Sequence, residues 1–266
     1  MGLADYAVQQ TMLWLLFLLR ALGFVFLAPL FSVRSAPPIF RFGLGFLLAV
    51  LAYIAWAPTG ANAAWSAPHS FAEFLPLAVS EIILGLGLGF FTSLAFVAIQ
   101  WAGSLIGYQM GFAIVNVLDP HSQTQSSIIG EFLFAVSMLV FLDLNLHHDI
   151  LRLWHQSYTL APPGSFSLGA ASPMLLGGVM GEVSQLALQL ALPLMAFLLL
   201  ADLALGILAR ILPQMNVFAV GLSLKIGLGL LLLSFYVLGL DPAVRKAVYA
   251  SINEAGAWLH AIATVK

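Results

Sequence analysis

The chain has 266 residues, of which 62% are hydrophobic and 8% are charged, and its formal net charge is −2. Soluble domains are about 25% charged, so this composition indicates a polytopic membrane-class protein. The small negative charge gives no electrostatic basis for nucleic-acid binding, and the lack of cysteine excludes disulfides, thiol catalysis and cysteine metal ligands.

Apolar runs long enough to form helices follow one another along the chain. They cover residues 8–31, 39–57, 71–101, 128–142, 174–209 and 216–239, against about 20 residues needed to cross a bilayer. We expect the fourth run, which is shorter, to continue as a bent helix toward Tyr158. The fifth run is longer and contains Pro193, which predicts a kink. The sequence therefore predicts an all-α fold in a single domain, 1–266, with an amphipathic C-terminal tail at about 242–266.

The N-terminal segment and the basic residues bear on topology. The first residues lack the basic stretch of a cleavable signal, and Arg20 interrupts the first apolar run, so we expect this segment to be retained. Arg34 and Arg41 bracket the first turn, which the positive-inside rule places in the cytoplasm together with Arg210. The same count places the basic residues of the C-terminal tail outside, so a simple serpentine of spanning helices does not satisfy the rule.

Ionisable side chains lie within the apolar runs: Arg20, Glu81, Glu131, Glu182, Asp202, Arg210 and Lys225. A charged side chain at the centre of a spanning helix costs roughly 2.5 to 3.5 kcal/mol unless a partner or water receives it. One explanation is an ion or proton route, as in a secondary transporter, although no internal inverted repeat is visible. The other is buried pairing between helices or subunits. Asp202, Gly206 and Arg210 are spaced by four, which fits an intrahelical relay or a helix crossing point.

A polar break separates the last two apolar runs, at Pro213-Gln214-Met215-Asn216. Pro213 removes a backbone donor and disfavours a helical Leu212. The freed carbonyls and the amides of Gln214 and Asn216 need partners that lipid cannot supply. We therefore expect this element to face protein or a wet cavity.

Gly103, Gly107 and Gly111 recur every four residues and form a stripe of small residues on one helix face. Tight helix packing is the simpler explanation. The alternative is a flexible constriction whose backbone and Met110 line a passage, because methionine is soft and unbranched. The most polar stretch of the chain follows, with a turn signal at Asp119-Pro120.

Enzymatic and metal chemistry find little support. Asp143, His147, His148, Asp149 and His155 contain zinc-ligand residue types, but such residues also gather where a membrane helix leaves the hydrocarbon. No HExxH or GxSxG motif is present. We expect no catalytic residues, no metal and no cofactor.

In chain order, several motifs resemble the FliR/SctT family of type III secretion export-gate proteins. The similar stretches are Arg20 with Ala28-Pro29 and Ser35-Ala36-Pro37, Glu81 with Ile83-Leu84-Gly85 and Gly89-Phe90, Gly103 to Gly111, Asp119-Pro120 with Gln125, Asn145 with His147-His148, Ser157 to Gly164, and Arg210, Pro213 to Phe218, Gly221 and Lys225-Ile226. The last stretch is the most specific and favours the flagellar branch. Leu146 departs from the family pattern, which has glycine there, so a glycine-dependent bend is in question at this position.

The resemblance implies a non-enzymatic subunit built of bent helical hairpins within a spiral pore assembly, lifted toward the periplasmic side of the bacterial inner membrane in the flagellar basal body. It implies FliP-like and FliQ-like partner subunits, FlhA-like and FlhB-like export components, and unfolded protein substrates. The implied pore and plug residues are Gly103, Gly107, Gln109, Met110, Gly111, Asn116, Asp119 and Pro120. The implied polar packing residues between helices or subunits are Arg20, Glu81, Asp202, Arg210, Pro213, Gln214, Asn216 and Lys225. The alternative function is a free-standing secondary transporter or ion channel.

Overall fold

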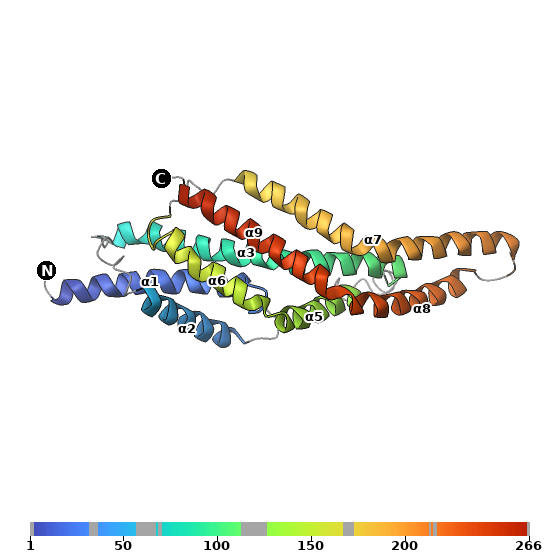
Figure 1. The fold of residues 1–266 in the computed structure, drawn as a ribbon, viewed down its shortest axis with the longest axis horizontal. Helices are drawn as coiled ribbons and strands as arrows, with labels where there is room; N and C mark the ends of the chain where they lie inside the picture. Colours follow the sequence, from blue (N-terminus) through green and yellow to red (C-terminus); the bar gives the residue numbers. More distant parts are fainter. Residues whose placement is uncertain are drawn as a thin grey trace. The chain divides into compact units, whose positions relative to one another are not determined.

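The computed structural model describes residues 3–31, 37–56, 68, 71–112, 127–166, 173–212, 214 and 217–264. Helices account for most of these residues, and none of them lies in a strand. The helices are α1 (Leu3–Leu27), α2 (Pro38–Trp56), α3 (Phe71–Met110), α5 (Ile128–Asp143), α6 (Leu146–Leu160), α7 (Pro173–Ile211), α8 (Val217–Leu238) and α9 (Leu240–Thr264) (Figure 1). The prediction of an all-α fold is confirmed.

Five helical stretches among the described residues are long and apolar enough to cross a membrane. They are Ala7–Leu27, Pro38–Trp56, Phe71–Met110, Val179–Ile211 and Val220–Leu238. The pair α5 and α6 passes the same test as one broken span. The prediction of a polytopic membrane-class protein is therefore confirmed as well.

The break between α5 and α6 is made by an asparagine. Asn145 has φ 56, in the left-handed region, which asparagine tolerates better than most residues with a side chain. Leu146, where the resemblance led us to expect glycine, is the first residue of α6 and only 2% exposed. The interruption therefore needs no glycine at position 146.

One proline lies inside α7 and another follows the end of this helix in the sequence. Pro193 lies inside the helix, which continues to Ile211, and Figure 1 shows α7 curved along its length. This curvature agrees with the predicted kink, because an interior proline removes one backbone hydrogen bond. The helix ends just before Leu212, the residue that precedes Pro213, as expected for a residue that proline disfavours in a helix.

The chain divides into two compact units. The first comprises Met1–Leu94, Asn145–Gly178 and Tyr249–Lys266, and the second comprises Ala95–Leu144 and Val179–Val248. Helices α3, α7 and α9 therefore contribute to both units. The expectation of a single domain over residues 1–266 stays a prediction.

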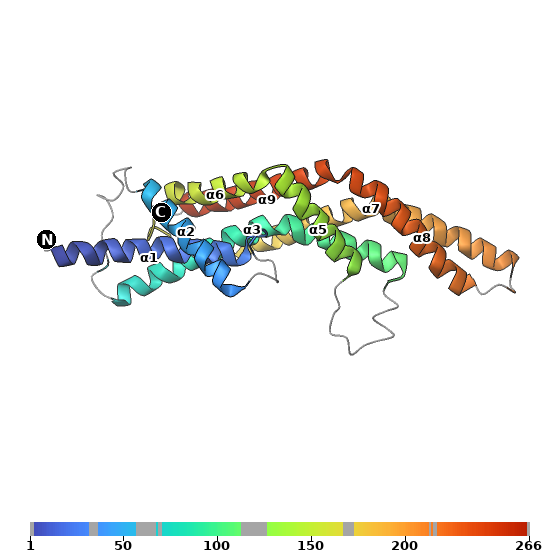
Figure 2. The same ribbon diagram turned by 90° about the horizontal axis from the view of Figure 1, so that it is seen from below.

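The first unit is built around α1, which packs against α2, α3 and α6. Phe17 of α1 makes edge contacts with Tyr53 and Trp56 of α2 and stacks on Tyr158 of α6, with ring centroids 4.5 Å apart. A side chain on Gly85 would collide with the backbone carbonyl of Arg20, so α1 and α3 meet backbone to backbone. Figure 2 shows α6 lying alongside the last part of α9.

The second unit contains the end of α3, α5, the α7–α8 hairpin and the start of α9. Phe96 of α3 contacts Phe134 and Phe141 of α5 edge to face. The hydroxyl of Tyr236 on α8 donates to the carbonyl of Leu190 on α7 at 3.1 Å, and both ribbon views show α7 and α8 side by side. Many apolar side chains of this hairpin are exposed, among them Leu192, Phe197 and Leu231.

Candidate functional site

The glycine-rich end of α3 packs against the start of α5. A methyl group on Gly103 would lie 2.6 Å from the Cα of Gly130, and one on Gly107 would lie 2.8 Å from the Oγ of Ser127. Ser127 also caps α5, because its Oγ accepts a hydrogen bond from the Gly130 N–H at 3.2 Å. These contacts favour close helix packing as the explanation of Gly103 and Gly107.

Gly111 terminates α3. Its φ is +96, its N–H donates to the Tyr108 carbonyl at 3.1 Å, and the Phe112 N–H donates to the Gly107 carbonyl at 3.1 Å. This pair of bonds is the Schellman arrangement, in which the residue after the helix takes a positive φ that suits glycine. A side chain at this position would also meet Leu222 of α8. The end of α3 is therefore sharply defined.

Met110 is completely buried beside α8. A methyl group on Gly229 would lie 2.6 Å from both the Cγ and the Cε of Met110, so the missing side chain of Gly229 makes the space that Met110 fills. Within this chain Met110 contacts protein on all sides and does not face an open passage. Its part in a pore stays a prediction.

Three helices of the second unit meet at Asp202. This carboxylate on α7 accepts a hydrogen bond from the Nε2 of Gln109 on α3 at 2.9 Å. The Nζ of Lys225 on α8 lies 2.8 Å from its Oδ1 and 3.0 Å from its Oδ2. The Asp202 side chain is 39% exposed and that of Lys225 is 18% exposed. We call these three residues the Asp202 cluster, in which internal pairing lowers the cost of placing two charges in apolar helices.

A second polar centre lies in the first unit, where Arg20 and Glu81 have no exposed surface. Arg20 donates through Nε to Glu81 Oε2 at 2.6 Å and through Nη2 to Oε1 at 3.0 Å, a bidentate pair. The guanidinium also donates to the carbonyls of Ser157 and Ala161, each at 2.9 Å. It lies over the ring of Tyr158, 4.4 Å from the centroid.

The turn after α6 completes this centre. The N–H of Gly164 donates to Glu81 Oε1 at 2.8 Å. Both charges therefore have several protein partners, and the pair locks α1, α3 and the end of α6 together. Such a fully enclosed pair is suited to packing.

The remaining predicted residues fall into two groups. Arg210 and Gln214 are exposed at the end of α7, as are Glu182 along this helix and Glu131 on α5. Gln185 and Gln189, which follow Glu182 by three and seven residues and share its helix face, are exposed as well. Asn116, Asp119, Pro120, Pro213 and Asn216 lie outside the described residues. Among the described residues, the structure thus joins Arg20 to Glu81 and Gln109 to Asp202 and Lys225.

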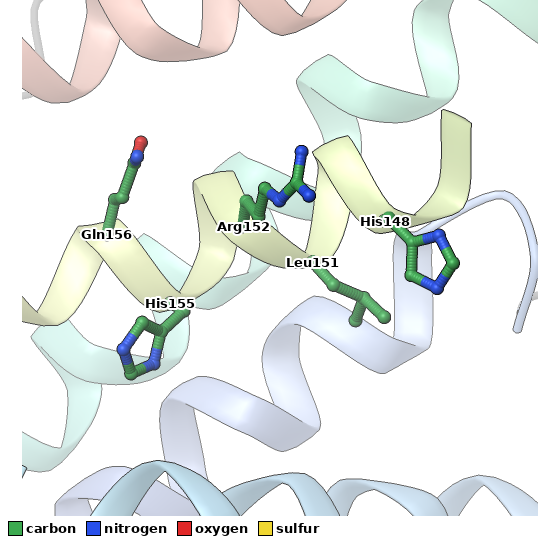
Figure 3. A pocket seen from close by; sticks show the side chains of 5 residues that line it. All are labelled: His148, Leu151, Arg152, His155 and Gln156. Carbon is green, nitrogen blue, oxygen red and sulfur yellow. The ribbon is translucent and has the colours of Figure 1, made fainter. Parts of the chain in front are cut away.

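The histidine-rich face of α6 forms a shallow open groove of about 360 Å³. Figure 3 shows its lining residues, which are His148, Leu151, Arg152, His155 and Gln156. Asp149 pairs with Arg152 of this groove at 3.0 Å and accepts a hydrogen bond from the Tyr249 hydroxyl at 3.2 Å. Within the described ranges, no three histidine or carboxylate side chains come together to hold a metal ion.

Sequence reasoning identified the charged residues but missed several of their partners. The carbonyls of Ser157 and Ala161 and the N–H of Gly164 are backbone groups, which no side-chain pattern reveals. Gly229 was missed although a signal existed, because it follows Lys225 by four residues and so lies on the same face of α8.

Comparison with known proteins gives matches over most of the chain. The family model "Bacterial export proteins, family 1" matches residues 11–250. The flagellar biosynthetic protein FliR of Bacillus subtilis is 35% identical over 251 residues, covering 90% of this chain and 92% of the relative. FliR of Escherichia coli is 32% identical, covering 82% of this chain and 81% of the relative. The Yop proteins translocation protein T of Yersinia pestis is 29% identical, covering 92% and 94%. The Asp202 cluster and the Arg20–Glu81 pair lie within the matched residues.

Proposed function

Because the chain belongs to the bacterial export proteins, family 1, and is a membrane component of a type III export apparatus, we propose that it is a structural pore subunit of the export gate. It assembles with FliP-like and FliQ-like membrane proteins in the bacterial inner membrane, at the flagellar basal body. Unfolded flagellar proteins pass through this pore, and FlhA-like and FlhB-like components act with it. The chain itself catalyses no reaction.

The uncovered surface of the α7–α8 hairpin carries this proposal. Only 17% of each apolar window in α7 and α8 is buried. The same α7 exposes Glu182, Gln185 and Gln189, whose polar groups lipid cannot pair. A neighbouring membrane subunit that supplies both apolar contacts and polar partners accounts for this mixed surface.

In this proposal the gate is formed by the end of α3 and the plug-like residues after it. The described part is Gly103 to Phe112, docked on α8 through Met110 and Gly229. Asn116, Asp119 and Pro120 follow, outside the described residues. An unfolded substrate that passes through the pore displaces the end of α3. The flexible side chain of Met110 then limits the leakage of ions around this substrate.

The alternative function is a free-standing transporter or channel. The partial exposure of the Asp202–Lys225 pair within apolar helices favours it, since such pairs also occur in ion routes. The two functions differ in whether the chain works alone. Purification therefore separates them.

The test is to tag the chain, co-express it with the FliP-like and FliQ-like proteins of the same organism, and purify it in mild detergent. We expect both partners to be retained through size-exclusion chromatography. Replacing Glu182, Gln185 and Gln189 together by alanine should lower their retention, whereas Gln156→Ala on the exposed face of α6 serves as the matched control. Recovery of the folded chain without either partner would contradict the proposal.

A further inference from the structure

We propose that Asp202 is the positioning residue that holds the end of α3 in its closed position. It does so by binding Gln109 and Lys225 through one carboxylate. The inference rests on the proposed function, which assigns the end of α3 to the gate. It identifies Asp202 as the group that keeps the end of α3 in place, and the hydrogen bond from Gln109 to Asp202 as the contact that breaks when the gate opens.

Three successive residues at the end of α3 contact the α7–α8 hairpin. Gln109 donates to Asp202, Met110 fills the space beside Gly229, and Gly111 lies against Leu222. Leu222, Lys225 and Gly229 are spaced by three and four, so they share one face of α8. The end of α3 is therefore docked on this face by one directional bond and two apolar contacts.

The polar bond sets the position of this docked segment. Apolar contacts have no strong directional preference, and a methionine side chain adapts to many shapes. The bond from Gln109 to the Oδ2 of Asp202 at 2.9 Å fixes both distance and direction. Asp202 is itself anchored, because Lys225 lies within 3.0 Å of both of its carboxylate oxygens.

The two bonds of Asp202 differ in what they join. The ion pair with Lys225 is internal to the α7–α8 hairpin, whereas the bond with Gln109 ties α3 to this hairpin. Moving the end of α3 therefore breaks the bond to Gln109 and leaves the ion pair intact. Gln109 is the releasable partner, and the Asp202–Lys225 pair is the fixed anchor.

A cross-link reports whether the end of α3 is docked. The chain has no cysteine, so Met110→Cys with Gly229→Cys introduces the only thiol pair. A methyl group on Gly229 would lie 2.6 Å from the Cγ of Met110, which places the two Cβ positions in disulfide range. The rate of disulfide formation after addition of a thiol oxidant is measured in membranes that contain the complete complex.

Adding Gln109→Glu sets a carboxylate against Asp202, and we expect the cross-linking rate to fall on the order of tenfold through like-charge repulsion. Adding Asp202→Asn as well should restore the rate, because the new amide can donate to the new carboxylate. Gln156→Glu makes the same chemical change on the exposed face of α6 and should leave the rate unchanged.

The outcomes distinguish the positioning role of Asp202 from the proposed role of the end of α3 as a gate. An unchanged rate in Gln109→Glu, or a loss that Asp202→Asn does not reverse, would overturn the role of Asp202. Ion permeability of cells that express the complex with Gln109→Glu, without the two cysteine substitutions, is the second measurement. A slower cross-link with raised permeability supports both assignments. A slower cross-link with unchanged permeability supports the positioning role and contradicts the proposed gate.

Discussion

Arg20 and Glu81 lie 61 residues apart in the chain and form a bidentate ion pair in which neither side chain has any exposed surface. The same guanidinium binds two carbonyls at the end of α6, so a single charge pair joins three helices of the first unit. A buried charge without a partner is far more costly than a buried pair. The stability of the first unit therefore depends on both members being present.

Glu81→Gln is expected to destabilise the protein by about 3–5 kcal/mol, because it leaves Arg20 buried without a counter-charge. Thermal unfolding of the detergent-purified complex measures this effect. Asp149→Asn is the control, since it removes an ion pair whose arginine side chain is 74% exposed. Its effect should stay within about 1 kcal/mol. Equal losses in the two variants would show that burial of the pair does not matter.

Gly111→Ala should destabilise the end of α3 by about 1–2 kcal/mol, because the backbone there has φ +96 and an added side chain meets Leu222. Gly227→Ala is the control, since an added methyl group on this helical glycine of α8 has nothing within 4 Å. Alanine favours helices over glycine by roughly 1 kcal/mol, so the control should be neutral or stabilising within this chain. Hydrogen exchange of the backbone amides at the end of α3 is measured in Gly111→Ala and Gly227→Ala. Equal protection of these amides in both variants would contradict the prediction.

Arg210→Ala should lower assembly of the complex without unfolding the chain. Arg210 is exposed at the end of α7. We expect it to meet an acidic group of a neighbouring subunit, because a charge at the end of an apolar helix needs a partner or water. Native gel electrophoresis of solubilised membranes measures the assembled fraction, with Arg152→Ala as the control on the exposed face of α6. Normal assembly in Arg210→Ala would remove this residue from the subunit interface.

Deleting residues 107–112 should make membranes that contain the complex leak ions, because it removes the docked end of α3 together with Met110. The measurement is ion conductance in cells that express all three membrane subunits. Assembly is checked on the same samples by native gel, so a lost complex is not mistaken for a closed gate. An assembled complex with unchanged conductance would count against a plug at this position.

Much of the helical fold can be read from the apolar runs. The run at 216–239 corresponds to α8, Val217–Leu238, and the break at Pro213 corresponds to the end of α7. The third apolar run ends near residue 101, but the spacing of Gly103, Gly107 and Gly111 places the next residues on a helix face, and α3 does continue to Met110. Glycine has a low helix propensity, and the close packing of Gly103 on Gly130 offsets this cost at the end of α3.

The charged residues could be identified from the sequence, but their pairing could not. Arg20, Glu81, Asp202 and Lys225 stand out because each is a costly charge in an apolar run. Which of them meet depends on which helices are neighbours, and that is a property of the folded chain. Glycines illustrate the same limit, since Gly103 lies against another backbone whereas Gly206 has open space around it.

Reconstitution into liposomes tests the central claim most directly, which is that partner subunits cover the exposed polar groups of α7, namely Glu182, Gln185 and Gln189. The purified chain is reconstituted alone and together with its FliP-like and FliQ-like partners, and ion and solute fluxes are measured in both preparations. The account predicts that the chain alone is unstable and inactive, and that the three proteins form one closed complex. A stable single chain that carries a solute or ion across the bilayer by itself would contradict it.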